Sequence, residues 1–180
     1  LKWHHMRIYY LLGFFLLSMI ACRQDNRTPL FDLFYPNLRF TIQAGENPLL
    51  PGAYVRQGIS TNISNLLQEF GTDTMSIGEI SALEARIVSL NGLEYDFLSA
   101  ISVRICEDGP EPCIQADEVF YLDRLQEFRE DEVLQLLPGL RNARRVLIKE
   151  DFRLEIVVFF AFSPPANYES QLNMTFRAYE

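Results

Sequence analysis

Residues 151–162 have the sequence DFRLEIVVFFAF, and this stretch decides the fold class of the chain. One parity is wholly apolar from Phe152 to Phe162, which is the two-residue period of a β-strand. Val157 and Phe159 add apolar side chains to the opposite parity. The pattern therefore predicts a central strand that is covered on both faces.

Alternating segments lie on both sides of this strand. After Pro164-Pro165, the apolar residues Leu172, Met174 and Phe176 alternate with polar ones, which predicts a half-buried closing strand. Asn91-Gly92 is a strong turn signal between two further strands. In all, the remaining strands are expected at 38–42, 80–90, 95–105, 119–122 and 145–149, while 127–137 is ambiguous between a helical turn and a strand.

One short helix is expected from Thr61 to Phe70. Thr61 can cap its start, its apolar residues fall on one face, and Gly71 stands where a left-handed residue ends a helix. Several strands separated by turns, with this single helix, predict a mainly β fold, an antiparallel β-sandwich over residues 37–180.

The charge of the chain excludes some partners. Its formal charge of −8 becomes −10 if Lys2 and Arg7 are removed with an N-terminal signal. Binding to nucleic acid needs a concentrated positive face, so no nucleic-acid partner is expected. The same excess of acid argues against attachment to anionic lipid through charge alone.

The N-terminal segment has the features of an export signal. Met6-Arg7 is followed by a 13-residue apolar run, Ile8 to Ile20, which is too short for a helix to cross a bilayer. It fits the apolar region of a cleaved signal peptide instead. We therefore expect residues 1–21 to be removed.

The end of that run, Met19-Ile20-Ala21-Cys22, resembles the lipobox of bacterial lipoproteins. The resemblance implies that Cys22 is lipidated, so that the chain attaches to a membrane through its acyl chains. Residues 22–36 would then form a tether, and Arg23 instead of Asp after the cysteine favours the outer membrane of the cell envelope. The alternative is a plain secretory signal in which Cys22 is incidental.

Catalytic motifs are scarce in the sequence. Both histidines, His4 and His5, precede the expected cleavage site, which excludes Ser-His-Asp and Cys-His catalysis and imidazole metal ligation from the mature chain. Phosphate-loop, dinucleotide and EF-hand motifs are missing as well. We expect no catalytic residue, no cofactor and no metal site.

The remaining polar clusters admit several readings. Cys106 and Cys113 make a poor zinc site without histidine, and we favour a local disulfide over two free thiols. The acid pairs could bind calcium or act in glycoside hydrolysis, although loop carboxylates are usually solvated. These pairs are Glu107-Asp108, Asp117-Glu118 and Glu130-Asp131-Glu132. Arg141, Arg144 and Arg145 are expected to form a solvated face and not a ligand site.

The chain from Phe40 onward is similar to small lipoproteins common in Bacteroidota. The shared traits are Asp96-Phe97-Leu98 before an alternating strand, a late segment like Leu140–Lys149, and an ending with Pro-Pro and Met174-Thr175-Phe176. The resemblance implies an immunoglobulin-like sandwich and no assigned activity.

Three functions follow as hypotheses. The first is a non-enzymatic accessory or structural subunit that docks on another envelope protein. The second is a glycan- or peptide-binding module, which would depend on tyrosines such as Tyr54, Tyr121 or Tyr168 because Trp3 is lost with the signal. The third is a hydrolase that uses carboxylates alone and requires a buried acid pair in a cleft.

Overall fold

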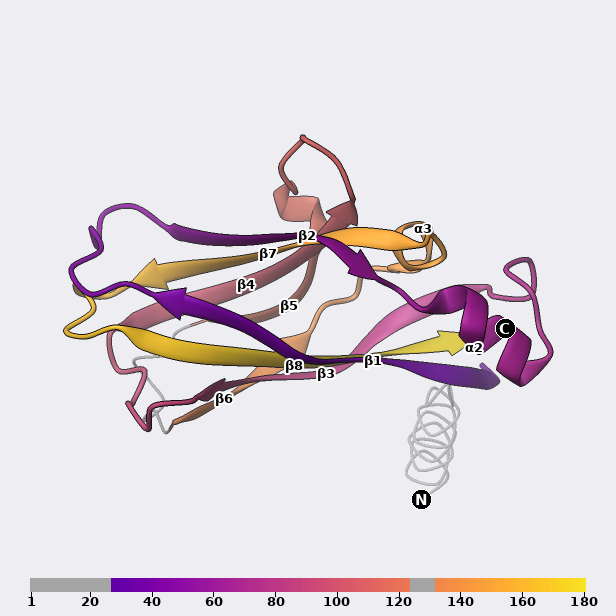
Figure 1. The fold of residues 1–180 in the computed structure, drawn as a ribbon, viewed down its shortest axis with the longest axis horizontal. Helices are drawn as coiled ribbons and strands as arrows, with labels where there is room; N and C mark the ends of the chain where they lie inside the picture. The colour runs from indigo at the N-terminus through magenta and orange to yellow at the C-terminus, as the bar shows by residue number, and fades with distance from the viewer. Residues whose placement is uncertain (1–26, 124–131) are drawn as a thin grey trace, which may run out of the picture.

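The computed structural model describes residues 27–123 and 132–180, which form a mainly antiparallel β structure (Figure 1). The strands are β1 (Pro29–Ile42), β2 (Gly52–Ser60), β3 (Glu79–Ser89), β4 (Leu98–Glu107), β5 (Glu118–Asp123), β6 (Val133–Pro138), β7 (Asp151–Phe160) and β8 (Tyr168–Tyr179). The helices are α2 (Ile63–Phe70), α3 (Arg144–Leu147) and the 3-10 turn η2 (Gln115–Asp117). The predicted mainly β class is confirmed.

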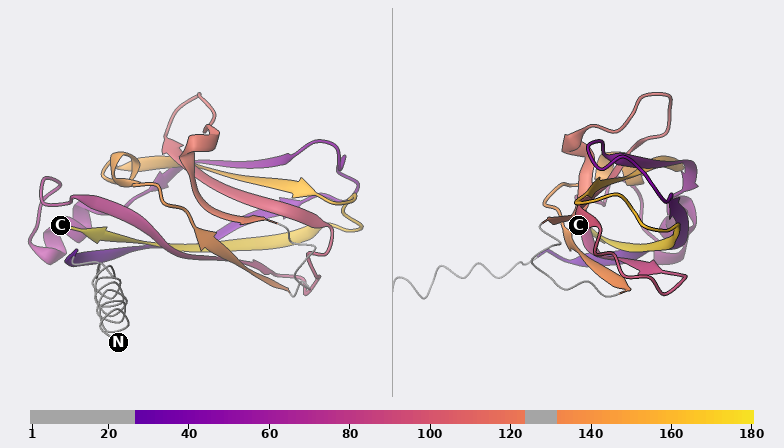
Figure 2. Two further views of the ribbon diagram at one scale, coloured as in Figure 1. Left: turned by 180° about the vertical axis from the view of Figure 1, so that it is seen from behind. Right: turned by 90° about the vertical axis from the view of Figure 1, so that its left-hand side faces the viewer.

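The strands of the described chain form one sheet in the order β1-β8-β3-β6-β5-β4-β7-β2. Their pairs are nested, with β4 on β5, β3 on β6, β2 on β7 and β1 on β8. A chain paired in this way is one long hairpin wound upon itself, which is the jelly-roll arrangement. The sheet curls until it is nearly barrel-shaped (Figure 2), and its two edge strands approach where the rings of Phe40 and Tyr54 lie 5.4 Å apart.

This strand order differs from the immunoglobulin-like order that we expected. In immunoglobulin domains the first two strands are neighbours in one sheet. Here β1 and β2 stand at opposite ends of the strand order, and each pairs with a strand from the last third of the chain. Hydrophobic alternation predicts strands but does not specify their partners, so the sequence pattern did not distinguish the two arrangements.

The expected tether was too long. Residues 29–36 belong to β1, which pairs with β8 from Pro29↔Tyr179 to Ile42↔Tyr168. The ladder shifts register between Tyr35 and Leu38, where Asn37 has a positive φ of 61°. This irregularity and the two prolines interrupt the alternation, so the first half of β1 was taken for an extended linker.

Residues 151–160 form β7, and the predicted covering of both faces is confirmed from Phe152 to Val158, whereas Phe159 on the outer face is exposed. Phe152, Leu154 and Ile156 point into the core. On the opposite face, Arg153 and Glu155 are also buried and form an ion pair with 2.7 Å between Nη2 and Oε1. An ion pair beneath a loop, more than apolar packing, therefore accounts for the burial of the outer face.

One local prediction was wrong, and another differs at one end of the element. The segment 145–149 was expected to be a strand, but α3 begins at Arg144 and buries Val146 and Leu147. A short apolar run suits a strand and a buried helical turn equally well. The helix predicted over 61–70 is present as α2, and Gly71 has the left-handed conformation expected at its end. It begins at Ile63 with Asn62, not Thr61, at the N-cap, and the Thr61 hydroxyl bonds the carbonyls of Lys149 and Glu150.

One element was found only with the structure, and one of two sequence alternatives is decided by it. The edge strand β2 is largely exposed, so it lacks the apolar alternation that marks a strand. Within the ambiguous segment 127–137, residues from Val133 onward lie in β6, and 127–131 lie outside the described residues. No helix in the ranges 27–123 and 132–180 has both the length and the apolar content needed to cross a membrane.

Candidate functional site

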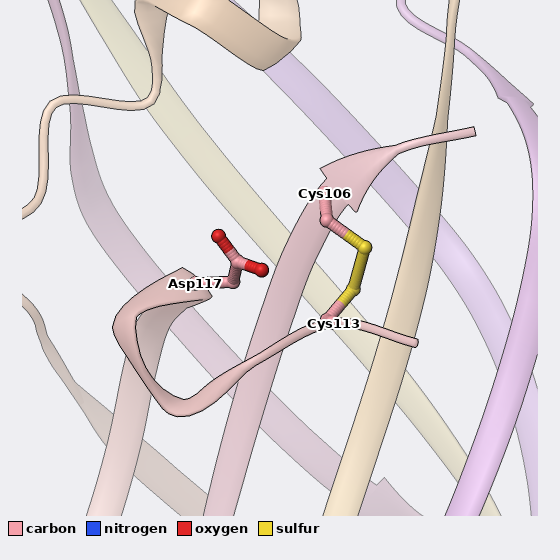
Figure 3. A group of neighbouring side chains, drawn as sticks. All are labelled: Cys106, Cys113 and Asp117. Carbon is pink, nitrogen blue, oxygen red and sulfur yellow. A yellow bond between two sulfur atoms is a disulfide. The ribbon is translucent and has the colours of Figure 1, made fainter. Parts of the chain in front are cut away.

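The loop between β4 and β5 brings together several of the polar residues singled out in the sequence. We call residues 107–117 the disulfide loop, because Cys106 at the end of β4 is joined to Cys113 with a Cα–Cα distance of 5.5 Å. Figure 3 shows this bond beside Asp117, at the end of η2. The loop projects above the sheet near β2 and β7 (Figure 1).

Three hydrogen bonds hold the tip of the loop against the sheet. The carbonyl of Gly109 accepts bonds from Arg153 Nη1 at 3.1 Å and from Gln57 Nε2 at 2.9 Å. The backbone N–H of Gly58 donates to Asp108 Oδ1 at 3.2 Å. The loop thereby covers the buried Arg153–Glu155 pair, which explains how two charged residues are accommodated on the outer face of β7.

Asp117 fixes the far end of the loop. Its Oδ2 accepts a bond from the N–H of Ile114 at 2.9 Å, and its Oδ1 lies 2.7 Å from Arg141 Nη1. Arg141 also donates to the carbonyl of Ile105 at 3.1 Å. The Asp117 carboxylate is therefore committed to structural partners.

A cleft of about 600 Å³ lies between the disulfide loop and the connection that contains α3. Its lining includes the carboxylates of Glu107, Asp108, Glu111 and Asp117 and the guanidinium groups of Arg141 and Arg145. Glu107 bonds Lys149 Nζ at 2.7 Å and Arg145 Nε at 3.2 Å, and these two partners hold the pKa of its carboxyl below the usual value. Acidic groups thus outnumber cations, and the two arginines are already paired.

The three clustered arginines point in different directions. Arg141 bonds Asp117, and Arg145 is the solvated member. Arg144 turns to the segment after α2, where its Nη2 and Nε donate to the carbonyls of Thr74 and Ile77. The three arginines therefore do not form one anion site. The prediction that they lie in solvent is right for Arg145 and wrong for Arg141 and Arg144, which bond to other parts of the chain.

The described residues contain one group of possible metal ligands, and most of its donor atoms are already bonded. Within the described residues, one group has suitably placed donors: Cys106, Cys113 and Asp117, whose ligand atoms lie within 4.8 Å of one another. Both sulfur atoms are used in the disulfide, so neither is available as a thiolate. Of the third acid cluster considered for calcium, Glu130 and Asp131 lie outside the described residues.

The tyrosines considered for glycan binding do not form a platform. Tyr168 is buried in a ring cluster, 4.3 Å from Phe97. Tyr54 donates its hydroxyl to Glu46 Oε1 at 2.6 Å, and burial together with this acceptor raises its pKa. Tyr121 faces outward on β5 but stands without a neighbouring aromatic ring among the described residues.

A surface that the sequence did not reveal crosses the outer face of β6, β5, β4, β7 and β2. The strand registers align uncharged side chains across all five strands, and we call this set the apolar row. Its members are Leu137, Tyr121, Ser102, Val157 and Ala53, with Phe159 and Ala100 paired beside it. Leu137 is 50% exposed and Phe159 is 40% exposed, whereas Val157 and Ser102 at the centre of the row are buried. Ser102 accepts a hydrogen bond from Arg104 Nε at 3.2 Å, so a charged side chain lies beside the row.

The outer face of β1, β8 and β3 differs sharply. It carries the ion pair Asp32–Arg177, with Nε 2.7 Å from Oδ1, and the polar residues Glu84, Arg86 and Asn173. The face that carries the apolar row also holds Arg104 and the covered Arg153–Glu155 pair, so the two outer faces differ in the row itself and not in the presence of charge. The only sequence signal for the apolar row was the apolar second parity of β7, at Val157 and Phe159.

Comparisons with known proteins do not identify the chain. No protein-family model matches it, and no curated protein matches it. Among solved structures, a chain of Cocksfoot mottle virus covers 88% of this chain and 87% of its own length, at 11% identity and a TM-score of 0.29. A likeness at that level carries no argument about fold or function.

Proposed function

We propose that the chain is a lipid-anchored envelope protein that acts as a non-enzymatic accessory or structural subunit by docking on another envelope protein. The apolar row is the observation that carries this proposal. Its exposed apolar side chains, Leu137 and Phe159, lie on either side of a buried centre, and a partner that covers both would exclude water from them. The charged outer face of β1, β8 and β3 remains in solvent.

The anchor in this proposal rests on residues 1–22. A cleaved signal over residues 1–21 and acyl chains on Cys22 would place the domain at the outer membrane, as in the Bacteroidota lipoproteins that the sequence resembles. Cys22→Ala is expected to release the protein into the soluble envelope fraction. Membrane retention of this variant at the wild-type level would contradict lipidation.

The docking surface is tested by matched substitutions on the two outer faces. Phe159→Glu and Leu137→Glu put a charge beside or within the apolar row, whereas Phe34→Glu puts one at a 61% exposed apolar position on β1. In a pull-down of the tagged, full-length protein from detergent-solubilised envelope, the first two variants should lose a stoichiometric partner by tenfold or more. Phe34→Glu should retain it.

Two results would count against docking through the apolar row. Recovery of the lipoprotein alone from wild-type envelope would mean that no stable partner exists. Equal recovery of a partner by all three variants would mean that the partner binds elsewhere. Circular dichroism of each variant would establish that the substitutions leave the fold intact.

The cleft beside the disulfide loop favours a second candidate, the binding of a peptide or glycan. Its volume of about 600 Å³ suits a small ligand, and Pro112 and Ile114 add apolar surface to its charged lining. Ile114→Glu should abolish binding to any peptide or glycan array feature that the wild-type protein binds. Unchanged binding by this variant would exclude the cleft as the site.

A further inference from the structure

The turn that follows α2 presents apolar side chains to solvent. Phe70, the last residue of α2, is half-exposed, and Met75 in residues 71–78 is 85% exposed. The α2 end lies opposite the connection between β1 and β2, which is at the other end of the curled sheet (Figure 1). Exposed apolar side chains are ordinary when scattered, so their setting decides whether they have a role.

The backbone that carries Met75 is firmly held. Asp73 Oδ1 accepts bonds from the N–H groups of Met75 and Ser76, both at 2.9 Å. Arg144 binds the carbonyl of Thr74 at 2.9 Å, and the N–H of Gly78 bonds the carbonyl of Tyr179. Met75 is therefore displayed on an ordered turn, and the Asp73 carboxylate is directed to that turn's own amides.

This turn lies beside the start of β1, which the proposed lipid anchor precedes. The ring of Phe70 stacks on Phe31 with 5.5 Å between centroids, and Pro29 begins the strand. Cys22 stands only seven residues before Pro29, so the connecting chain spans at most about 25 Å. A lipid surface attached at Cys22 is thus within reach of the α2 end.

We infer that Phe70 and Met75 enter the lipid surface to which Cys22 is anchored and hold the α2 end against the membrane. The inference rests on the proposed lipidation, and adds an orientation that acyl chains alone do not impose. Aromatic and thioether side chains are suited to the boundary between headgroups and acyl chains. Glu69 and Asp73 offset Arg144 here, so the described part of this region offers no concentrated positive charge and a zwitterionic lipid surface suits it.

The test uses single tryptophans as depth reporters. Loss of Trp3 with the signal leaves the mature chain without tryptophan, so Met75→Trp or Leu49→Trp supplies the only indole. Leu49 is the matched control because it is 87% exposed and lies in the connection between β1 and β2. Each lipidated variant is reconstituted into phosphatidylcholine vesicles with and without brominated acyl chains, and its fluorescence is compared.

The expected result is strong quenching of Met75→Trp by brominated lipid, at least threefold greater than that of Leu49→Trp. If the variants float with the vesicles but Met75→Trp is quenched no more than Leu49→Trp, the inference is wrong and the anchor stands. If the processed proteins do not float, lipidation fails and the inference fails with it. Mass spectrometry of the purified chain shows whether residues 1–21 were removed.

Discussion

At the scale of single residues, most of the polar clusters have structural partners. Cys106, Cys113 and Asp117 stand out in the sequence as candidates for chemistry, and the structure brings them together in the disulfide loop. The ion pair of Asp117 with Arg141 could not be predicted, because Arg141 lies in a different part of the sequence, beyond β6. The bond that Asp117 accepts from the N–H of Ile114 is local, but the sequence does not show that this loop turns back on itself. Residue types show what a site could contain, but only the fold shows which groups are already bonded.

The disulfide is expected to stabilise the fold by about 2 kcal/mol, the value for a short loop closed by one bond. Replacing both Cys106 and Cys113 by serine should lower the free energy of unfolding by that amount. Urea unfolding with and without dithiothreitol measures it. The stability of the double variant should not change with the reductant. Equal stability of the variant and the oxidised wild-type protein would show that the disulfide does not stabilise the fold.

Asp32 should make the stability depend on pH. Its bonds to Arg177 hold the pKa of the carboxyl below its ordinary value of 3.8. A carboxyl with a depressed folded pKa contributes stability above the unfolded pKa, and this is lost as pH falls from about 3.8 through the folded value. In Asp32→Asn, the free energy of unfolding should therefore fall less steeply with pH in that window. In Arg177→Gln, the pKa of Asp32 measured by NMR titration should return toward 3.8.

At the scale of elements, strands with a buried face were the predictable ones. The alternating residues of β7 and β8 gave their positions because one parity packs in the core. The edge strand β2 and the start of β1 were not predicted. An edge strand can lack strict apolar alternation and can contain proline, so neither segment shows the usual strand pattern. The short helix α3 was taken for a strand because four residues are too few to show a period.

The segment before β3 packs tightly against the end of β8. A Cβ atom added to Gly78 would lie 2.8 Å from the backbone carbon of Glu180, whereas one added to Gly109 would have no neighbour within 4 Å. Gly78→Ala should therefore lower the free energy of unfolding by about 1–3 kcal/mol, the usual cost of overpacking. Gly109→Ala is the control and should change it little in the same urea titration. Equal effects would contradict the close approach at Gly78.

At the scale of the whole molecule, the nested pairing makes nearly every strand contact long-range. The first strand cannot pair until the last is available, because β8 lies between β1 and β3. Removing residues 164–180 should therefore leave an unfolded chain, whereas removing only Glu180 should not. A folded truncated chain would contradict this account.

Refolding of the untruncated chain should take milliseconds to seconds in stopped-flow measurements, as in other β proteins of high contact order.

The pairing of Pro29 with Tyr179 also has a mechanical consequence. A load applied ahead of β1, directed along that strand and resisted by a partner on the opposite face, would shear the β1–β8 ladder and strain its hydrogen bonds together. A load applied between the two chain ends would instead open the same ladder one pair at a time, at a far smaller force. If Cys22 anchors the chain as proposed, a pull along β1 would load this ladder in shear, the direction in which the outermost strand resists most strongly.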